Sequence, residues 1–196
     1  MVNYSVAIQA GGMSNRMGRD KGLLPFGAVT LVEHIINQIK PLGYEIYIIS
    51  NSPEDYRFLG LPVYSDVHEG IGALAGIHTI LTYAQSDYIL ALACDMPYVE
   101  LKLIRYLIGL SPNHDIVIPS LGDRAFLEPF RAVYSHKCLA SVENAILSGR
   151  RKVISFFGDL DVIQIPPEKI HQFDPEERSF ININTPEDYE RLLAEI

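Results

Sequence analysis

The sequence predicts an α/β fold built around a mostly parallel β-sheet. In its first half, short apolar runs alternate with segments whose apolar residues recur at helical spacing, a pattern typical of βαβ units. The run over residues 87–94 is almost continuously apolar, as expected for a central parallel strand that is buried on both faces. A glycine-rich loop directly follows the first predicted strand, where open α/β sheets usually bind their ligands.

Eight segments have the length and composition of strands. The first ends abruptly at Gly11-Gly12, the third ends at Asp66 and the fourth ends at Asp95. The predicted strands cover residues 4–10, 44–50, 61–65, 87–94, 115–119, 128–134, 161–165 and 180–183.

Five segments are predicted to be helical. The first begins with Thr30 and Glu33 at the spacing of a capping box and ends before Pro41 and Gly43. The last opens with Thr185 as its N-cap and a proline in its first turn. The predicted helices cover residues 30–40, 72–85, 100–110, 137–149 and the segment from 185 onwards.

The composition is that of an ordinary globular domain. With 196 residues, of which 48% are hydrophobic and 20% charged, we expect a single domain that buries roughly 70% of its unfolded surface. The net charge of −8 argues against non-specific binding to nucleic acid or anionic membranes. No signal peptide or membrane span is visible, and Cys94 and Cys138 lack a CxxC or histidine partner. We therefore expect a reduced, cytoplasmic protein.

The candidate chemistry is concentrated in the loop from Ala10 to Lys21. This loop combines three glycines with the cations Arg16, Arg19 and Lys21, although the chain as a whole is acidic. Glycines let backbone N–H groups approach a polyphosphate, and the cations can neutralise its charge. The loop matches neither GxxxxGK[ST] nor GxGxxG, and a solvated turn with incidental charges is the alternative interpretation. The clustering of three cations favours phosphate binding.

Several motifs along the chain resemble those of one enzyme family, the molybdenum cofactor guanylyltransferases. This family belongs to the nucleotidyltransferases with a Rossmann-like fold. The most specific motif is Ala10-Gly11-Gly12-x-Ser14-x-Arg16-Met17-Gly18-x-Asp20-Lys21, followed by Leu23-Leu24-Pro25. The resemblance continues through Asn51, Asp66, Gly72-Ala73-Leu74-Ala75-Gly76-Ile77, Cys94-Asp95-Met96-Pro97-Tyr98 and Phe180-Ile181-Asn182-Ile183-Asn184-Thr185-Pro186-Glu187.

The resemblance implies a three-layer Rossmann-like nucleotidyltransferase fold with a mostly parallel mixed sheet. It further implies a single nucleotidyltransferase domain over residues 1–196, with a nucleotide-binding half near 1–110 and an acceptor-binding half near 111–196. The implied reaction transfers GMP from GTP to the terminal phosphate of Mo-molybdopterin, with Mg²⁺ as cofactor. The products are molybdopterin guanine dinucleotide and pyrophosphate. Beyond GTP and Mo-molybdopterin, the implied partners are proteins that deliver the cofactor or receive it, in transient contacts.

Residue roles carry over from the matching motifs. Asp95 is the implied metal ligand, and a carboxylate at the end of a buried strand suits Mg²⁺, although it could instead cap the following helix. The alternative roles are a turn residue for Asp66 and an Asx-type turn for Asn51. The implied catalytic residues are Arg16, Lys21 and Asp95. The implied nucleotide-binding residues are Gln9, Ala10, Gly11, Gly12, Lys21, Asn51, Asp66 and Asp95.

Two further groups are candidates for contacting the acceptor. Arg150 and Arg151 form a second basic cluster, which could simply complement the end of the preceding helix. Asn182 and Asn184 alternate with isoleucines on a short predicted strand, which would place both amides on one face. That face could meet the acceptor or satisfy loop backbone.

Two departures from the family pattern bear on the choice of base. Gln9 stands where the family usually has an apolar residue, and Ala73 replaces a frequent proline. They weaken the inference to guanine more than the inference to a triphosphate. Transfer of CMP to the same pterin, or of another nucleotide to a phosphorylated acceptor, is therefore the first alternative. A nucleotide-binding module without catalysis is the second.

Overall fold

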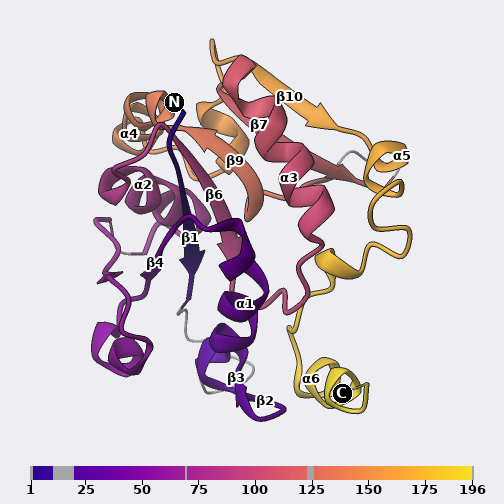
Figure 1. Cartoon of the computed structure of the whole chain (residues 1–196). Coiled ribbons are helices and arrows are strands. Elements are labelled where there is room, and N and C mark those ends of the chain that lie inside the picture. Colours follow the sequence, from indigo (N-terminus) through magenta and orange to yellow (C-terminus); the bar gives the residue numbers. More distant parts are fainter. Residues whose placement is uncertain (1, 11–19, 69, 123–125, 196) are drawn as a thin grey trace.

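The computed structural model describes residues 2–10, 20–68, 70–122 and 126–195. Within them, an eight-stranded sheet has the main strand order β10-β7-β9-β6-β1-β4-β5, with β8 paired to β7 (Figure 1). The strands are β1 (Tyr4–Gln9), β4 (Glu45–Ile49), β5 (Val63–Tyr64), β6 (Tyr88–Ala93), β7 (Ile116–Leu121), β8 (Phe126–Leu127), β9 (Arg131–Ser135) and β10 (Val162–Ile165). A separate hairpin joins β2 (Pro25–Phe26) to β3 (Val29–Thr30).

The sheet is mostly parallel, as the sequence predicted. β1 pairs in parallel with β4 on one side and with β6 on the other, and β4 continues in parallel to β5. β9 runs antiparallel to both β6 and β7, and β10 pairs in parallel with β7. The order β5-β4-β1-β6 is that of a doubly wound half-sheet, whose ligands bind where the strand order reverses.

Helices cover both faces of the sheet and give three layers. Val6 and Ile8 of β1 pack in one core with α1 and α3, whereas Ala7 packs in a second core with α2 and α4, as the period-2 alternation of a strand requires. The helices are α1 (Leu31–Ile39), α2 (Ala73–Tyr83), α3 (Leu101–Leu110), α4 (Leu139–Leu147), α5 (Pro167–Ile170) and α6 (Pro186–Leu193). None of the helices in the described residues is long and apolar enough to cross a membrane.

The two helix starts predicted from capping residues are confirmed. Thr30 and Glu33 form a capping box at α1, in which each side chain bonds the other residue's backbone N–H. Thr185 and Asp188 form a second box at α6. Such caps satisfy amide groups that a helix start leaves without partners.

One predicted strand starts later than expected, and another does not form. The strand expected from residue 128 begins at Arg131. The strand expected over residues 180–183 does not form, because a 3₁₀-helix, η7 (Arg178–Phe180), ends there and the next residues join no ladder. Instead, the Ile183 N–H donates to the carbonyl oxygen of Asp95 at 2.8 Å. The apolar alternation of this segment reflects docking against a loop, which a strand pattern cannot distinguish from pairing.

Close packing fixes the segment that follows the glycine-rich loop. This segment begins with the 3₁₀-helix η1 (Lys21–Leu23), whose N-cap Asp20 accepts a hydrogen bond from the Gly22 N–H at 3.0 Å. A Cβ placed on Gly22 would lie 2.5 Å from the hydroxyl oxygen of Tyr56, a residue with no exposed surface. Glycine is therefore required at position 22 by the neighbouring ring.

We predict that Gly22→Ala destabilises the fold by about 1–3 kcal/mol, because overpacking forces a buried ring to move. Urea unfolding measures the change. Gly109→Ala is the matched control, since Gly109 lies in α3 and its Cβ would meet nothing within 4 Å; it should be neutral or stabilising by up to about 1 kcal/mol. Equal stability of Gly22→Ala and the wild type would contradict the packing argument.

Candidate functional site

The candidate site lies at the carboxyl edge of the sheet, where β1 and β6 end side by side. Hydrogen bonds continue the ladder past the strand ends, with Ala10 N–H donating to Ile49 O at 2.8 Å and Cys94 N–H to Gln9 O at 2.9 Å. Ala10 is fully buried. The glycine-rich loop and the loop that carries Asp95 therefore start from a rigid base at the point where the strand order reverses.

Three segments meet at this edge through the side chain of Lys21. Its ammonium nitrogen lies 3.1 Å from Asp95 Oδ2 and 3.1 Å from Asn184 Oδ1. The side chains of Lys21 and Asp95 are 14% and 26% exposed, so the ion pair is partly shielded and still open to a ligand. The structure thus brings together one predicted catalytic cation, the predicted metal ligand and one predicted acceptor residue.

A small hydrophobic core holds Asn184 in this position. Phe26 from the β2–β3 hairpin packs with Leu31, Ile183 and Leu192, all four of them buried. The hydroxyl of Tyr189 on α6 also donates to the carbonyl oxygen of Pro25. Burial of each large apolar side chain contributes about 1.5–3 kcal/mol, so α6 is fixed against the hairpin, and Asn184, two residues before the helix, reaches Lys21.

Asp95 does not cap the next helix. The N-cap of α3 is Glu100, whose side chain accepts from the Lys102 N–H at 2.9 Å. The alternative role for Asp95 that the sequence allowed is therefore wrong, and its carboxylate faces Lys21 instead.

Asn51 and Asp66 form a reciprocal pair between the ends of β4 and β5. Asn51 Nδ2 donates to Asp66 Oδ2 at 3.1 Å, and the Asp66 N–H donates to Asn51 Oδ1 at 2.9 Å. The next residue, Val67, donates its N–H to Thr79 Oγ1 on α2 at 3.0 Å. The Asn51 side chain thus bonds Asp66 at the end of the neighbouring strand and does not form a local Asx turn. Both residues lie at the same edge of the sheet as Asp95.

Gln9 points from the end of β1 toward α2. A Cβ on Gly76 would lie 2.6 Å from Gln9 Oε1, so the glycine leaves the space that the amide occupies. Gln9 Oε1 is buried and accepts no hydrogen bond from the residues that the structure describes. The predictions for Gly11, Gly12 and Arg16 lie outside the described residues.

Among the remaining acceptor candidates, the two arginines follow α4, whereas Asn182 lies two residues before Asn184. Arg150 follows α4 and donates through Nη1 to Ser155 O at 2.7 Å, and α4 packs in the core on the α2 face. Figure 1 shows α4 near the N-terminus and α6 at the opposite end of the molecule. Asn182 Nδ2 donates to Phe180 O at 3.2 Å. Asn184 contacts Lys21. In the described part of the chain, no hydrogen bond or ion pair joins Arg150, Arg151 or Asn182 to Lys21.

Sequence reasoning missed Arg131, a cation in the core beside this site. Arg131 has no exposed surface and lies opposite Leu92 in the β6–β9 ladder. Burial lowers its pKa to about 10, while the carboxylates of Glu128, Asp174 and Asp95 oppose that change, so it stays protonated at neutral pH. Burial also raises the pKa of Glu128, and the Arg131 charge partly offsets this. The sequence signal was a single arginine inside an apolar run.

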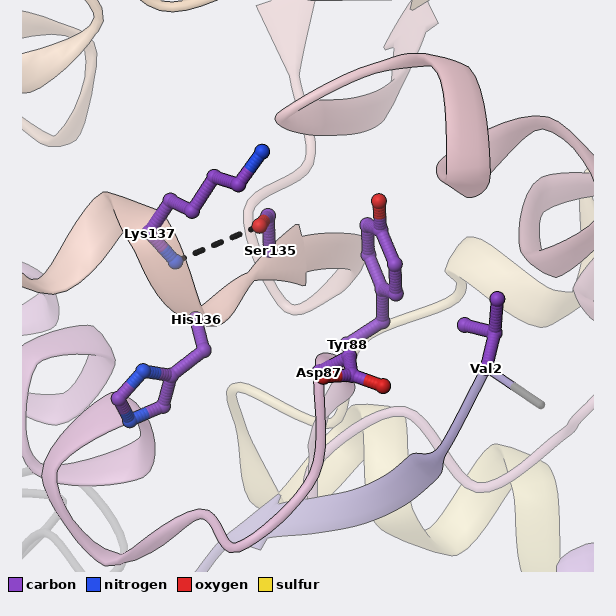
Figure 2. Close-up of a pocket in the computed structure, with 6 residues that line it drawn as sticks. All are labelled: Val2, Asp87, Tyr88, Ser135, His136 and Lys137. Carbon is purple, nitrogen blue, oxygen red and sulfur yellow. Dashed lines mark hydrogen bonds between the residues drawn. The ribbon is translucent and has the colours of Figure 1, made fainter.

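A separate cavity of about 350 Å³ lies at the opposite edge of the sheet. Figure 2 shows its lining, where the Lys137 N–H donates to Ser135 Oγ at 3.3 Å. Asp87 and Tyr88 precede and begin β6, and Ser135 ends the antiparallel β9. This cavity is therefore at the amino edge, away from Lys21 and Asp95, and we do not assign the site to it.

Several known proteins that are similar to this chain are nucleotidyltransferases. The chain matches the family described as "MobA-like NTP transferase domain" over residues 6–162. It is 38% identical to the molybdenum cofactor guanylyltransferase of Syntrophotalea carbinolica, covering 95% of this chain and 89% of that protein. It is 36% identical to a probable molybdenum cofactor guanylyltransferase of Carboxydothermus hydrogenoformans, covering 98% of this chain and 96% of that protein.

Solved structures agree with this assignment. Molybdopterin-guanine dinucleotide biosynthesis protein A from Archaeoglobus fulgidus superposes with a TM-score of 0.81 at 30% identity, covering 97% of each chain. A 4-diphosphocytidyl-2C-methyl-D-erythritol synthase from Anaerococcus prevotii shares the fold at a TM-score of 0.72 and 16% identity, covering 99% of this chain and 96% of that chain. The predicted three-layer nucleotidyltransferase fold is confirmed, and the chain belongs to the MobA-like NTP transferase family.

Proposed function

We propose that this protein is a molybdenum cofactor guanylyltransferase, which transfers GMP from GTP to the terminal phosphate of Mo-molybdopterin and releases pyrophosphate. The observation that carries the proposal is the contact of Lys21 with both Asp95 and Asn184. A cation, a carboxylate and an amide from three distant segments converge there at the edge where doubly wound sheets bind nucleotides. The names of the full-length relatives support guanylyl transfer to a molybdenum cofactor.

The nucleotide would lie along the ends of β1, β4 and β5. Ala10 supplies a rigid start for the glycine-rich loop, and the pair of Asn51 and Asp66 lies where the nucleoside would be. We propose that Lys21 leaves its ion pair with Asp95 to bind the triphosphate, which carries more negative charge than one carboxylate. Arg16 would add a second cation from the same loop.

The reaction would be an in-line displacement at the α-phosphorus of GTP. A terminal phosphate oxygen of the acceptor attacks phosphorus, the bond between the α-phosphorus and its β-bridging oxygen breaks, and pyrophosphate leaves with that electron pair. Positioning and charge neutralisation supply most of the catalysis in such transfers. Lys21 would stabilise the charge that builds up on the leaving pyrophosphate.

The oxygens at Asp95 fit a magnesium ion that is shared with phosphates. Within the described ranges no group of three or more His, Cys, Asp or Glu side chains could hold a metal by itself. Mg²⁺ is commonly bound by one or two carboxylates, with phosphate oxygens and waters completing its shell. Asp95 is partly exposed and is the carboxylate that would hold it. When bound, the ion would neutralise phosphate charge.

The acceptor would approach from the side of α6. Asn184 already contacts Lys21, and it would bind the acceptor's phosphate once Lys21 moves to the nucleotide. We propose Asn182 as a second contact on the same segment. We propose Arg150 and Arg151 as further acceptor contacts on the basis of their positive charge alone. They follow α4, which packs on the α2 face of the sheet.

We predict that GTP with Mg²⁺ raises the thermal unfolding temperature more than CTP, ATP or UTP does. A ligand that binds only the native state adds about 2.7 kcal/mol at 100 times its Kd, which differential scanning fluorimetry detects. Each nucleotide is measured with and without Mg²⁺. A larger shift with CTP would move the assignment to cytidylyl transfer, and no shift with any nucleotide would favour the non-catalytic module.

We predict that Asp95→Asn lowers kcat by a factor of about 10²–10³, the usual effect of removing one charge-stabilising group, while the unfolding temperature stays near that of the wild type. Pyrophosphate release from GTP in the presence of molybdopterin measures turnover. Asp159→Asn is the matched control, because Asp159 is exposed and lies far along the chain from Lys21, Asp95 and Asn184. Full activity of Asp95→Asn with Mg²⁺ would contradict the role of this carboxylate.

A further inference from the structure

The buried Arg131 binds the backbone on both sides of the candidate site. Its Nη2 donates to three carbonyl oxygens: Met96 O at 3.3 Å, Tyr98 O at 3.2 Å and Ser179 O at 2.7 Å. Met96 and Tyr98 belong to the loop that begins with Asp95, here called the Asp95 loop. Ser179 begins the 179–184 segment, which carries Asn184. One side chain therefore connects the loop of the predicted metal ligand to the segment of the predicted acceptor residue.

The stability of the core does not explain an arginine at this position. The side chain is wholly buried, and its Nε and Nη1 have no hydrogen-bond partner among the described residues. Within those residues, no carboxylate forms an ion pair with it inside 4.0 Å. A buried charge is costly unless hydrogen bonds and nearby opposite charges compensate it, and here the compensation comes from the carbonyl oxygens that Arg131 binds and from the carboxylates of Glu128 and Asp174. A charged donor kept here points to a geometric role for its hydrogen bonds.

The partner segments are themselves firmly anchored. Ser179 donates its N–H and its hydroxyl to Asp174 Oδ2, at 2.8 and 2.5 Å, and Asp174 is buried. Four residues later the Ile183 N–H donates to Asp95 O at 2.8 Å. The Asp95 loop and the 179–184 segment are thus joined at three places: by Arg131, by the bond from Ile183 to Asp95, and by Lys21.

We propose that Arg131 is a positioning residue that holds the Asp95 loop and the 179–184 segment at a fixed separation, so that the acceptor phosphate is aligned with the α-phosphorus. The inference rests on the proposed function for its effect on turnover. Its effect on the backbone is independent of that function. Arg131 itself touches neither substrate, because it is buried beneath the loop.

Weakening the hydrogen bonds of Arg131 should impair turnover and acceptor binding more than GTP binding. A misplacement of about 1 Å between reacting groups can lower a rate about 10²-fold, so kcat should fall and the KM for the acceptor should rise. The affinity for GTP measured without Mg²⁺ should stay within about twofold, because Ala10, Asn51 and Asp66 are held by β1, β4 and β5 and not by the Asp95 loop. A residue with a merely structural role would lower the amount of folded protein and leave both constants unchanged.

The test compares Arg131→Lys and Arg131→Met with the matched controls Arg105→Lys and Arg105→Met. Arg105 lies on the exposed face of α3 and donates to one carbonyl, Pro41 O at 3.4 Å. Lysine keeps the charge and some donors, so we expect about a 10-fold loss of kcat for lysine and about 100-fold for methionine. Steady-state kinetics with both substrates gives kcat and KM, and isothermal titration calorimetry gives the Kd for GTP.

A second readout is the hydrogen exchange of the Ile183 amide, followed by NMR or mass spectrometry. We expect its protection to fall in Arg131→Lys and to stay at the wild-type level in both Arg105 variants. If the methionine variant does not fold, the lysine variant decides through the same two measurements. Wild-type kcat, acceptor KM and Ile183 protection in Arg131→Lys would overturn the inference. An inactive wild type would instead overturn the proposed function, and the Ile183 exchange would still test the connection.

Discussion

The parallel pairing of β1 with β4 and β6 is the constraint on which the rest of the site depends. Because β1 is flanked on both sides, its ladder continues beyond the strand to Ala10, which bonds Ile49, and from Gln9 to Cys94. These bonds fix where two loops leave the sheet, and the β4–β5 pair fixes a third exit at Asn51 and Asp66. A loop that starts from such a base can carry polar residues without burying unsatisfied backbone.

The second half of the chain completes the site by packing rather than by pairing. The buried cluster of Phe26, Leu31, Ile183 and Leu192 fastens α6 to a hairpin that follows the glycine-rich loop. Arg131 adds three hydrogen bonds from β9 to the same region. The site is therefore assembled from residues near positions 21, 95 and 184. Its chemistry depends on tertiary contacts made by the C-terminal part of the chain. On a chain of net charge −8, Lys21 concentrates positive charge where a triphosphate would bind.

Much of this arrangement could be predicted from the sequence, for identifiable reasons. The apolar run of β6, the capping box at Thr30 and the N-cap at Thr185 are local signals, and the structure confirms them. The positions of Asp95 and Asp66 at strand ends followed from the parallel sheet. The contact of Lys21 with Asn184 could not be derived from residue patterns, because it depends on how α6 docks. Arg131 was missed because a lone arginine in an apolar run gives no periodic signal, and the 180–183 strand was wrongly predicted because docking imitates strand alternation.

We propose that Lys21, between Asp95 and Asn184, serves guanylyl transfer to a pterin phosphate. The most direct measurement is the release of pyrophosphate from GTP, with and without molybdopterin, by the wild type and by Lys21→Met. We expect acceptor-dependent release that matches the dinucleotide formed and that falls by about 10²-fold or more in the variant. Release by Lys21→Met at the wild-type rate, or no acceptor-dependent release by the folded wild type, would contradict it.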